Sequence, residues 1–221
     1  MQIDFHAHIL PKADHGSDGL ETSLKQVSLA KEAGIDILAA TPHFYPISDT
    51  AEAFLTRRDH CWSELSAKLG KDAPRILLGA EVQLCRGIDH LQQIRELCLG
   101  GTDVLLLELP GDFRFKQFER SLDALRYDCK LKVVIAHVDR YPDLAEPILD
   151  AGFMGQLNAS SLCTLFKKKR YYDWIENGSI VALGSDLHGI KTGYSEFLRA
   201  KDKLGSLYPE IMARTRSLLG K

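Results

Sequence analysis

Short, strongly apolar runs alternate along the whole chain with longer stretches whose apolar residues recur every three or four positions. The first kind predicts buried strands, and the second predicts helices that bury one face. The first run begins almost at the N-terminus, where Ile3 and Phe5 alternate with Asp4 and His6. We predict seven strands in chain order, within the first eight residues and at Ile35–Ala40, Arg75–Leu84, Val104–Leu109, Lys132–Val138, Met154–Ala159 and Ile180–Gly184.

The amphipathic stretches lie between these strands, and glycines end several of them. Gly34, Gly70 and Gly152 each follow the last apolar residue of such a stretch, which is typical of a helix C-terminus. We predict helices at Glu21–Ala33, Thr50–Leu69, Ile88–Leu99, Phe118–Asp128, Leu144–Ala151, Ser195–Leu204 and Pro209–Leu219, and a further helix that ends about Tyr171–Glu176.

Strands that are apolar throughout and alternate with helices indicate a parallel sheet whose outer face is covered by helices. An open doubly wound sheet and a closed barrel both fit this pattern. The 221 residues, of which 45% are hydrophobic, suit one domain with a sizeable core. No linker, repeat or low-complexity tract divides the chain, so we expect a single domain over residues 1–221.

Composition excludes several classes of function. The net charge of −2 gives no indication of nucleic-acid binding or of attraction to an anionic membrane. No apolar run approaches the length that spans a bilayer, and the N-terminus does not have the pattern of a signal peptide. Five cysteines without a C-x-x-C motif argue against a disulfide framework and predict a reducing, cytoplasmic location.

Histidines and carboxylates gather at the C-terminal ends of the predicted strands. Residues two apart on a strand point the same way, so His6 and His8 project together. A barrel brings strand ends to one face, whereas an open sheet spreads them over about 25 Å, at ~4.8 Å per strand. We therefore favour a barrel, with one face that carries His6, His8, His43, Glu81, Glu108, His137, Asp186 and His188.

Each of these residues alone has a structural explanation. Glu81 and Glu108 follow apolar residues and are costly to bury without a cation, while His137 alone is most simply a core histidine. Eight such coincidences at equivalent strand ends are improbable, so the set predicts a metal site. Mixed imidazole and carboxylate ligands suit Zn, Mn or Fe, and this many ligands imply more than one ion.

Three further histidines lie outside the strand ends. His15, in the loop segment Asp14-His15-Gly16, is placed to fold back over the site, although a solvent-exposed loop residue is the alternative. His60 and His90 fall in helical segments, and we interpret both as surface residues without a functional role.

The order of these motifs resembles the PHP (polymerase and histidinol phosphatase) metal-dependent phosphoesterases. The likeness is greatest to the bacterial protein-tyrosine phosphatases encoded with capsule and exopolysaccharide genes. It rests on His6-x-His8, Thr-Pro-His43, Gly-Ala-Glu81, Glu108, Ile-Ala-His137 and Ser-Asp186-x-His188, and on His8-Ile-Leu-Pro, Ala-His137-Val-Asp-Arg140-Tyr141 and Gln156-Leu-Asn158.

The resemblance implies an α/β fold, a distorted (β/α)7 TIM-like barrel of the PHP type, with three divalent ions. The ions are Mn, Fe, Zn or Mg, with Mn favoured. By resemblance, one ion is held by His6, His8, Glu81 and Asp186; a second by Glu81, Glu108 and His137; and the third by His15, His43 and His188.

The chain departs from that branch at two places. The tyrosine phosphatases usually have Asp-Asp-Gly where this chain has Asp14-His15-Gly16, although other PHP phosphatases have histidine there. An arginine that follows the Ser-Asp-x-His motif in the branch has no counterpart here, and Lys191 is the nearest cation.

We predict a metal-dependent phosphomonoesterase of the protein-tyrosine-phosphatase type. The five cysteines lack a Cys-x5-Arg loop, and no Ser-His-Asp arrangement stands out as a rival nucleophile. Clustered ions would activate a bridging water, and the hydroxide would attack phosphorus in line. We assign His43, Glu108 and Arg140 as catalytic, with Arg140 as a phosphate clamp. The alternative for Arg140 is a surface side chain paired with Asp139 or Asp143.

The resemblance implies a phosphotyrosine protein as partner, namely a polysaccharide-polymerisation tyrosine kinase. The loops after His43 and Glu108 form the expected walls of the site. We expect Phe113 and Phe115, with Phe44 and Tyr45, to offer aromatic surface to the phenyl ring, and Lys191, with Arg114 and Lys116, to lie near the phosphate. The alternative is that these aromatic residues only close the mouth of the barrel.

Three other functions remain open at this point. A histidinol-phosphate phosphatase would share every ligand. An amidohydrolase that cleaves C–N bonds would share His-x-His and the barrel, but it usually has a bridging carboxylated lysine where Glu81 and Glu108 stand here. A PHP domain that binds metal only for structure is the third.

Overall fold

The computed structural model describes residues 1–111, 113–163, 169–191 and 193–220, and within them all strand pairing is parallel. The strand predicted at Ile35–Ala40 ends at Thr41-Pro42, beyond which lies a short strand that was not predicted, and the predicted strand Arg75–Leu84 is interrupted at Gly79-Ala80. Proline lacks the N–H that a strand ladder needs, which explains the first break. The strands are β1 Ile3–Ala7, β2 Ile37–Ala40, β3 His43–Phe44, β4 Arg75–Leu78, β5 Glu81–Gln83, β6 Val104–Glu108, β7 Lys132–Ile135, β8 Met154–Asn158 and β9 Ile180–Gly184.

The strands form two sheets, in the orders β1-β2-β4 and β3-β5-β6-β7-β8-β9. Because β2 runs into β3 and β4 runs into β5, the two sheets follow one curved path from β1 to β9. The ends of that path meet just beyond β9, where the Asp186 N–H donates to the His6 carbonyl (2.8 Å) and the His8 N–H donates to the Leu187 carbonyl (3.2 Å). The predicted α/β class is therefore confirmed, and an isolated bridge between Ala7 and Leu187, rather than a strand ladder, joins β1 to the segment after β9.

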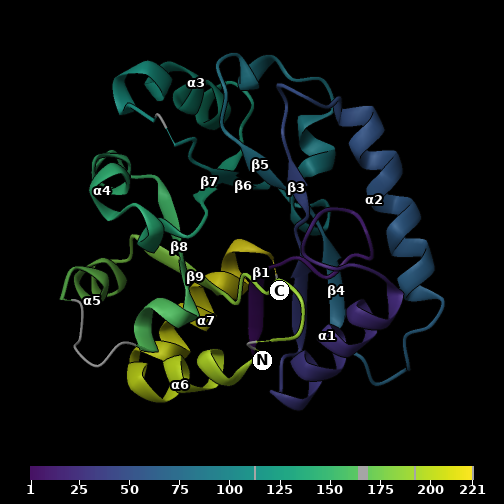
Figure 1. Ribbon diagram of the computed structural model, residues 1–221. Helices are drawn as coiled ribbons and strands as arrows, with labels where there is room; N and C mark the ends of the chain where they lie inside the picture. Colours follow the sequence, from purple (N-terminus) through teal and green to yellow (C-terminus); the bar gives the residue numbers. More distant parts are fainter. Residues whose placement is uncertain (112, 164–168, 192, 221) are drawn as a thin grey trace.

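Helices lie around the outside of the strands (Figure 1). Their bounds agree with the sequence prediction to within a few residues at all but one place. The helices are α1 Leu20–Glu32, α2 Ala51–Ser66, α3 Phe115–Tyr127, α4 Pro142–Asp150, α5 Lys169–Glu176, α6 Ser195–Leu204 and α7 Leu207–Leu218. Helix α7 covers the place where β1 and β9 meet, since Met212 accepts a hydrogen bond from the Ile3 N–H and Thr215 donates one to the Val181 carbonyl.

The helix predicted at Ile88–Leu99 is wrong. That segment contains three short 3₁₀ turns, η1 Ile88–His90, η2 Ile94–Leu97 and η3 Leu99–Gly101. Gln93 has a left-handed backbone (φ 61°) and Leu91 is extended, so consecutive turns cannot join into one α-helix. Two further 3₁₀ turns, η4 Val138–Arg140 and η5 Ala159–Cys163, follow β7 and β8.

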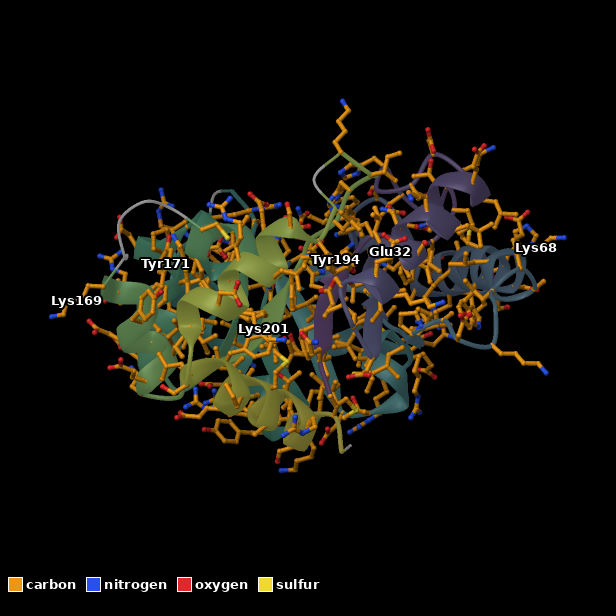
Figure 2. All side chains as sticks on the ribbon, turned by 90° about the horizontal axis from the view of Figure 1, so that it is seen from below. Glu32, Lys68, Lys169, Tyr171, Tyr194 and Lys201 are labelled. Atoms are coloured by element: carbon orange, nitrogen blue, oxygen red, sulfur yellow. The ribbon has the colours of Figure 1, made fainter. Side chains whose placement is uncertain are left out.

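Most of the strands are buried on both faces because one face points into the barrel and the other is covered by helices. Leu105, Leu106 and Leu107 of β6, for example, have no exposed surface. Tyr194, near the middle of the view in Figure 2, is buried, while Lys68 and Lys169 project at opposite sides of the molecule. Among the described residues, no helix is both long enough and apolar enough to cross a bilayer.

Candidate metal centre

The eight residues predicted at strand ends come together at one end of the strands. His6 lies on β1 and His8 just after it, His43 on β3, Glu81 on β5 and Glu108 on β6. Parallel register sets His43 opposite Glu81 and Glu108 opposite Gln83. The remaining three residues of the set follow the ends of β7 and β9, namely His137, Asp186 and His188.

Glu81 is the centre of the cluster, and its carboxylate is buried among four imidazoles. One oxygen, Oε1, lies 2.6 Å from His137 Nε2 and 3.5 Å from His6 Nε2. The other, Oε2, lies 2.9 Å from His43 Nδ1 and 3.3 Å from His8 Nε2. Each oxygen thus faces a different pair of histidines, and both oxygens can act as acceptors or ligands.

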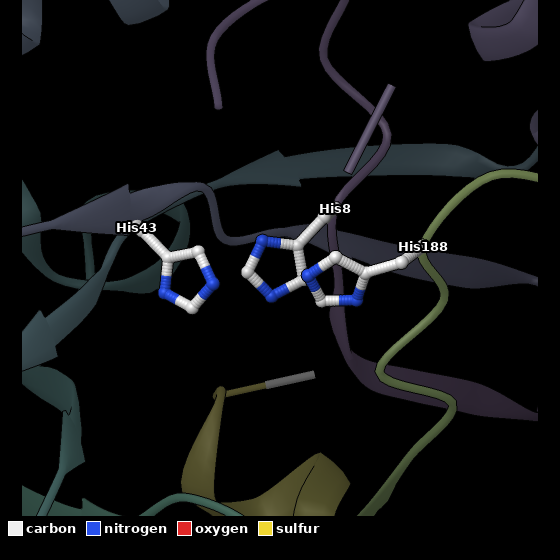
Figure 3. A group of neighbouring side chains, drawn as sticks. All are labelled: His8, His43 and His188. Carbon is white, nitrogen blue, oxygen red and sulfur yellow. The ribbon is translucent and has the colours of Figure 1, made fainter. Parts of the chain in front are cut away.

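The ligand atoms of the cluster fall into four groups of three, within each of which all atoms lie within 4.8 Å of one another. One group, His6, His8 and Glu81, contains three of the four residues that the resemblance implies for the first ion. A second group, His8, His43 and His188, contains two of the three residues implied for the third ion, with His8 in place of His15. Figure 3 shows the rings of this second group side by side. The other groups are His6, His137 and Asp186, and His43, Glu81 and Glu108.

His15 lies at the edge of the cluster. Its side chain is exposed, and its ring centroid is 4.9 Å from that of His43 and 4.7 Å from that of His188. No group of close ligand atoms among the described residues includes it. His60 and His90 are exposed and outside the cluster, as predicted.

Four buried polar atoms of the cluster form no well-aligned hydrogen bond among the described residues, namely His6 Nε2, His8 Nε2, His43 Nδ1 and Glu81 Oε2, although the last two lie 2.9 Å apart. Leaving such atoms unpaired costs about 1–3 kcal/mol each. All four face the same small volume, and together they are the nitrogen and oxygen donors that divalent ions bind. The residues present therefore fit a metal centre.

Neighbouring side chains fix which nitrogen of each imidazole faces the cluster. His6 Nδ1 is 2.6 Å from Thr41 Oγ1, His8 Nδ1 is 2.6 Å from Asp14 Oδ2, and His137 Nδ1 is 3.1 Å from the Tyr141 hydroxyl. In each case Nε2 is the ring nitrogen that faces the cluster, where it could bind a metal. Sequence reasoning did not assign roles to Thr41, Asp14 or Tyr141. The sequence signal for these roles was that each residue lies near a predicted ligand, in the segments Thr-Pro-His, Asp-His-Gly and His-x3-Tyr.

Two of the predicted ligands adopt a left-handed backbone that non-glycine residues rarely take, with φ of 30° at His137 and 52° at Asp186. Gln156 Oε1 accepts from the His137 N–H (2.7 Å), and Asn158 Nδ2 donates to Asp186 Oδ2 (2.9 Å). These bonds hold both residues in place. At Gly184 an added Cβ would lie 2.6 Å from Gln156 Nε2, so only glycine admits this network.

Opposite charges in the cluster shift the pKa values of its histidines and carboxylates. Burial alone would lower the pKa of His6, but Glu81 and Asp186 raise it to about 9. Burial alone would raise the pKa of Glu81, but the surrounding histidines, His6 first, lower it well below its ordinary value. Burial and the nearby charge of Glu81 raise the pKa of Glu108. Cations thus stabilise Glu81 as a carboxylate at the centre.

Arg140 lies at the mouth of the cluster with 47% of its side chain exposed. Its guanidinium forms an ion pair with Asp186, and Nη1 lies 3.4 Å from His137 Nε2. It is not paired with Asp139 or Asp143. Asp143 binds Arg170 instead, and the Asp139 carboxylate accepts from the Asn158 N–H. The guanidinium therefore reaches the cluster and keeps donors that face solvent.

The expectation of open aromatic surface is wrong for Phe113, which is 1% exposed and stacks on Phe118 with ring centroids 5.4 Å apart. Phe44 is equally buried, against Phe54. Both rings complete the core because an apolar ring gains more from packing there than from lying in solvent.

Phe115 is the first residue of α3 and packs partly buried against the core. Lys191 is exposed and forms no hydrogen bond or ion pair within the described part of the chain, so its contact with substrate stays a prediction. Tyr45 differs from the other aromatic residues, since it is 37% exposed and stacks on His43.

A family model described as capsular polysaccharide synthesis, CpsB/CapC, matches residues 2–215. A chain from the crystal structures of YwqE from Bacillus subtilis and CpsB from Streptococcus pneumoniae, described as unique metal-dependent tyrosine phosphatases, is 24% identical. The match covers 99% of this chain and 94% of that one, with a TM-score of 0.79.

More distant structural similarity reaches a β-aspartyl dipeptidase from Fervidobacterium islandicum AW-1. The identity is 13%, the TM-score is 0.53, and the match covers 98% of this chain and 74% of the dipeptidase chain. No curated protein sequence matches the chain. At these identities the structural likenesses establish a shared fold.

Proposed function

Since the CpsB/CapC model matches nearly its whole length, this chain belongs to the capsular polysaccharide synthesis family CpsB/CapC, and we propose that it is a metal-dependent protein-tyrosine phosphatase. The observation that carries the proposal is the buried Glu81 carboxylate with a different pair of imidazoles at each oxygen. The description of YwqE and CpsB as metal-dependent tyrosine phosphatases supports the same activity.

The proposed centre holds three divalent ions, with Mn favoured among Mn, Fe, Zn and Mg. In this assignment Glu81 would be a ligand of two of the ions, since its carboxylate lies within 3.5 Å of His6 and 3.3 Å of His8 from the first set and 2.6 Å of His137 from the second. The proposed ligands are His6, His8, Glu81 and Asp186 for the first ion, Glu81, Glu108 and His137 for the second, and His15, His43 and His188 for the third.

Divalent ions bound there would lower the pKa of a coordinated water and neutralise charge on the phosphoryl group. The protein's own side chains orient the ligands and bind the substrate. Thr41, Asp14 and Tyr141 orient the imidazoles, and Arg140 binds phosphate oxygens through the guanidinium donors that face solvent. A tyrosine leaving group has a pKa of about 10, so its departure needs only modest proton donation.

The proposed partner is a phosphotyrosine-bearing tyrosine kinase of polysaccharide polymerisation, by analogy with the capsule branch of the family. A cytoplasmic location accompanies this proposal. The free state of all five cysteines supports it, since disulfides are rare in a reducing compartment.

One experiment separates the competing functions. The protein is analysed for metal content and then assayed on phosphotyrosine peptide, phosphoserine peptide and histidinol phosphate, before and after exhaustive chelation. We expect phosphotyrosine turnover that is lost on chelation and restored by Mn²⁺. Turnover that survives chelation would refute the metal mechanism, and a preference for histidinol phosphate would reassign the substrate.

The fold shared with a β-aspartyl dipeptidase keeps an amidohydrolase activity as the second candidate. The cluster argues against it, because the carboxylates Glu81 and Glu108 occupy the middle strand ends where that class usually has a carboxylated lysine. Hydrolysis of an isoaspartyl dipeptide in the same screen would favour this candidate. If the protein binds metal but turns over no substrate, the metal has a structural role.

A further inference from the structure

Tyr45 lies beside the cluster and stacks on His43. It follows β3 directly, and its ring lies nearly parallel to that of His43, with centroids 5.3 Å apart and planes 17° apart. The next turn fixes its backbone, because the N–H groups of Ser48 and Asp49 both donate to the Tyr45 carbonyl at 3.0 Å. The ring is therefore held against a proposed ligand from a fixed point on the chain.

Tyr45 also remains accessible. Its side chain is 37% exposed, and within the described residues its hydroxyl has no hydrogen-bond partner. The other exposed or partly exposed groups at the cluster include Arg140, Glu108, His188 and His15, all of which are charged or polar. Among the large hydrophobic and aromatic side chains that are exposed in the described residues, only Tyr45 stacks on the ring of a cluster residue.

We propose that the ring of Tyr45 is the surface against which the aryl group of the substrate packs, so that this residue sets a preference for aryl over alkyl phosphates. The inference rests on the proposed phosphatase function. In an aryl phosphate one oxygen joins the ring to phosphorus, so a phosphoryl group bound at the cluster leaves the ring beside the ligands. Aromatic pairs gain energy in offset or edge-to-face contact, which an alkyl group cannot reproduce.

The test uses metal-loaded protein and two stable phosphate analogues, phenylphosphonate and methylphosphonate, with dissociation constants measured by calorimetry. Tyr45→Ala is expected to weaken phenylphosphonate binding about 3–10-fold and to change methylphosphonate binding less than about twofold. Tyr45→Phe keeps the ring and should bind both analogues like the wild type. Tyr127→Ala is the matched control, because Tyr127 is 57% exposed at the end of α3, away from the cluster.

Metal content is measured for every variant because Tyr45 packs on His43. If Tyr45→Ala loses metal, Tyr45→Leu, which keeps apolar volume over the imidazole, replaces it in the comparison. Equal weakening of both phosphonates, or of neither, overturns the inference. The proposed function fails separately, by absence of phosphomonoester turnover in the wild type, since the binding ratio requires no catalysis.

Discussion

Replacing Asp14 by asparagine tests whether the carboxylate that orients His8 controls metal affinity. Asp14 Oδ2 lies 2.6 Å from His8 Nδ1 and accepts from the His43 N–H at 2.9 Å, and Oδ1 accepts from the Gly16 N–H at 2.8 Å. Asparagine keeps the shape and one acceptor oxygen but removes the charge. The variant thus weakens the bond that aims His8 Nε2 at Glu81 and leaves the fold intact.

The expected loss of metal affinity follows from the hydrogen bond between Asp14 and His8. Outer partners of metal-bound histidines typically contribute 10–100-fold in affinity, or about 1.4–2.7 kcal/mol. The side chain of Asp14 is only 7% exposed, so solvent screens the interaction little. We expect Asp14→Asn to weaken metal binding by about 10–100-fold, measured by competition with a chromophoric chelator. Asp18→Asn is the matched control, because Asp18 is exposed in the same loop.

The same pair predicts a pH dependence of stability in the metal-free protein. Burial would raise the pKa of Asp14, but the bond and charge of His8 lower it well below 3.8. A depressed folded pKa stabilises the protein above the unfolded value, so the contribution is present above pH 3.8 and lost as the pH falls further. The stability difference between wild type and Asp14→Asn should therefore shrink below pH 3.8. An unchanged metal affinity in Asp14→Asn would refute the proposed orientation of His8.

Two further predictions concern the same centre. Arg140→Lys should raise KM and lower kcat for phosphotyrosine peptide at unchanged metal content, because an ammonium cannot form two parallel hydrogen bonds to phosphate. Arg170→Lys is the control, because Arg170 lies in an exposed ion pair with Asp143. Unchanged kinetics in Arg140→Lys would mean that Arg140 does not contact the phosphate. Metal affinity should rise as the pH increases toward 9, because in the metal-free protein His6 has a pKa of about 9 and metal must displace its proton. A flat affinity profile between pH 6.5 and 9 would exclude His6 as a ligand.

The sequence by itself determined the strands and the chemistry at their ends. Period-two and fully apolar runs are local signals, and the C-terminal ends of parallel strands must meet at one face. Hence the convergence of His6, Glu81 and His137 was predictable once the barrel was chosen. The local rules failed at Ile88–Leu99, where the left-handed Gln93 divides an apolar segment into 3₁₀ turns.

Only the tertiary structure decided which side chains support and border the centre. The bond between Asp14 and the His43 N–H spans 29 positions in the chain, and that between Thr41 and His6 spans 35, so no periodicity predicts them. Burial likewise depends on neighbours from other elements. Phe113 and Tyr45 are both aromatic residues in loops after strands, yet Phe113 is enclosed by the core and Tyr45 stays at the surface against His43. Residue type and spacing fix what a side chain can do, but its packing partners, which come from folding, determine whether it lies in the core or at the site.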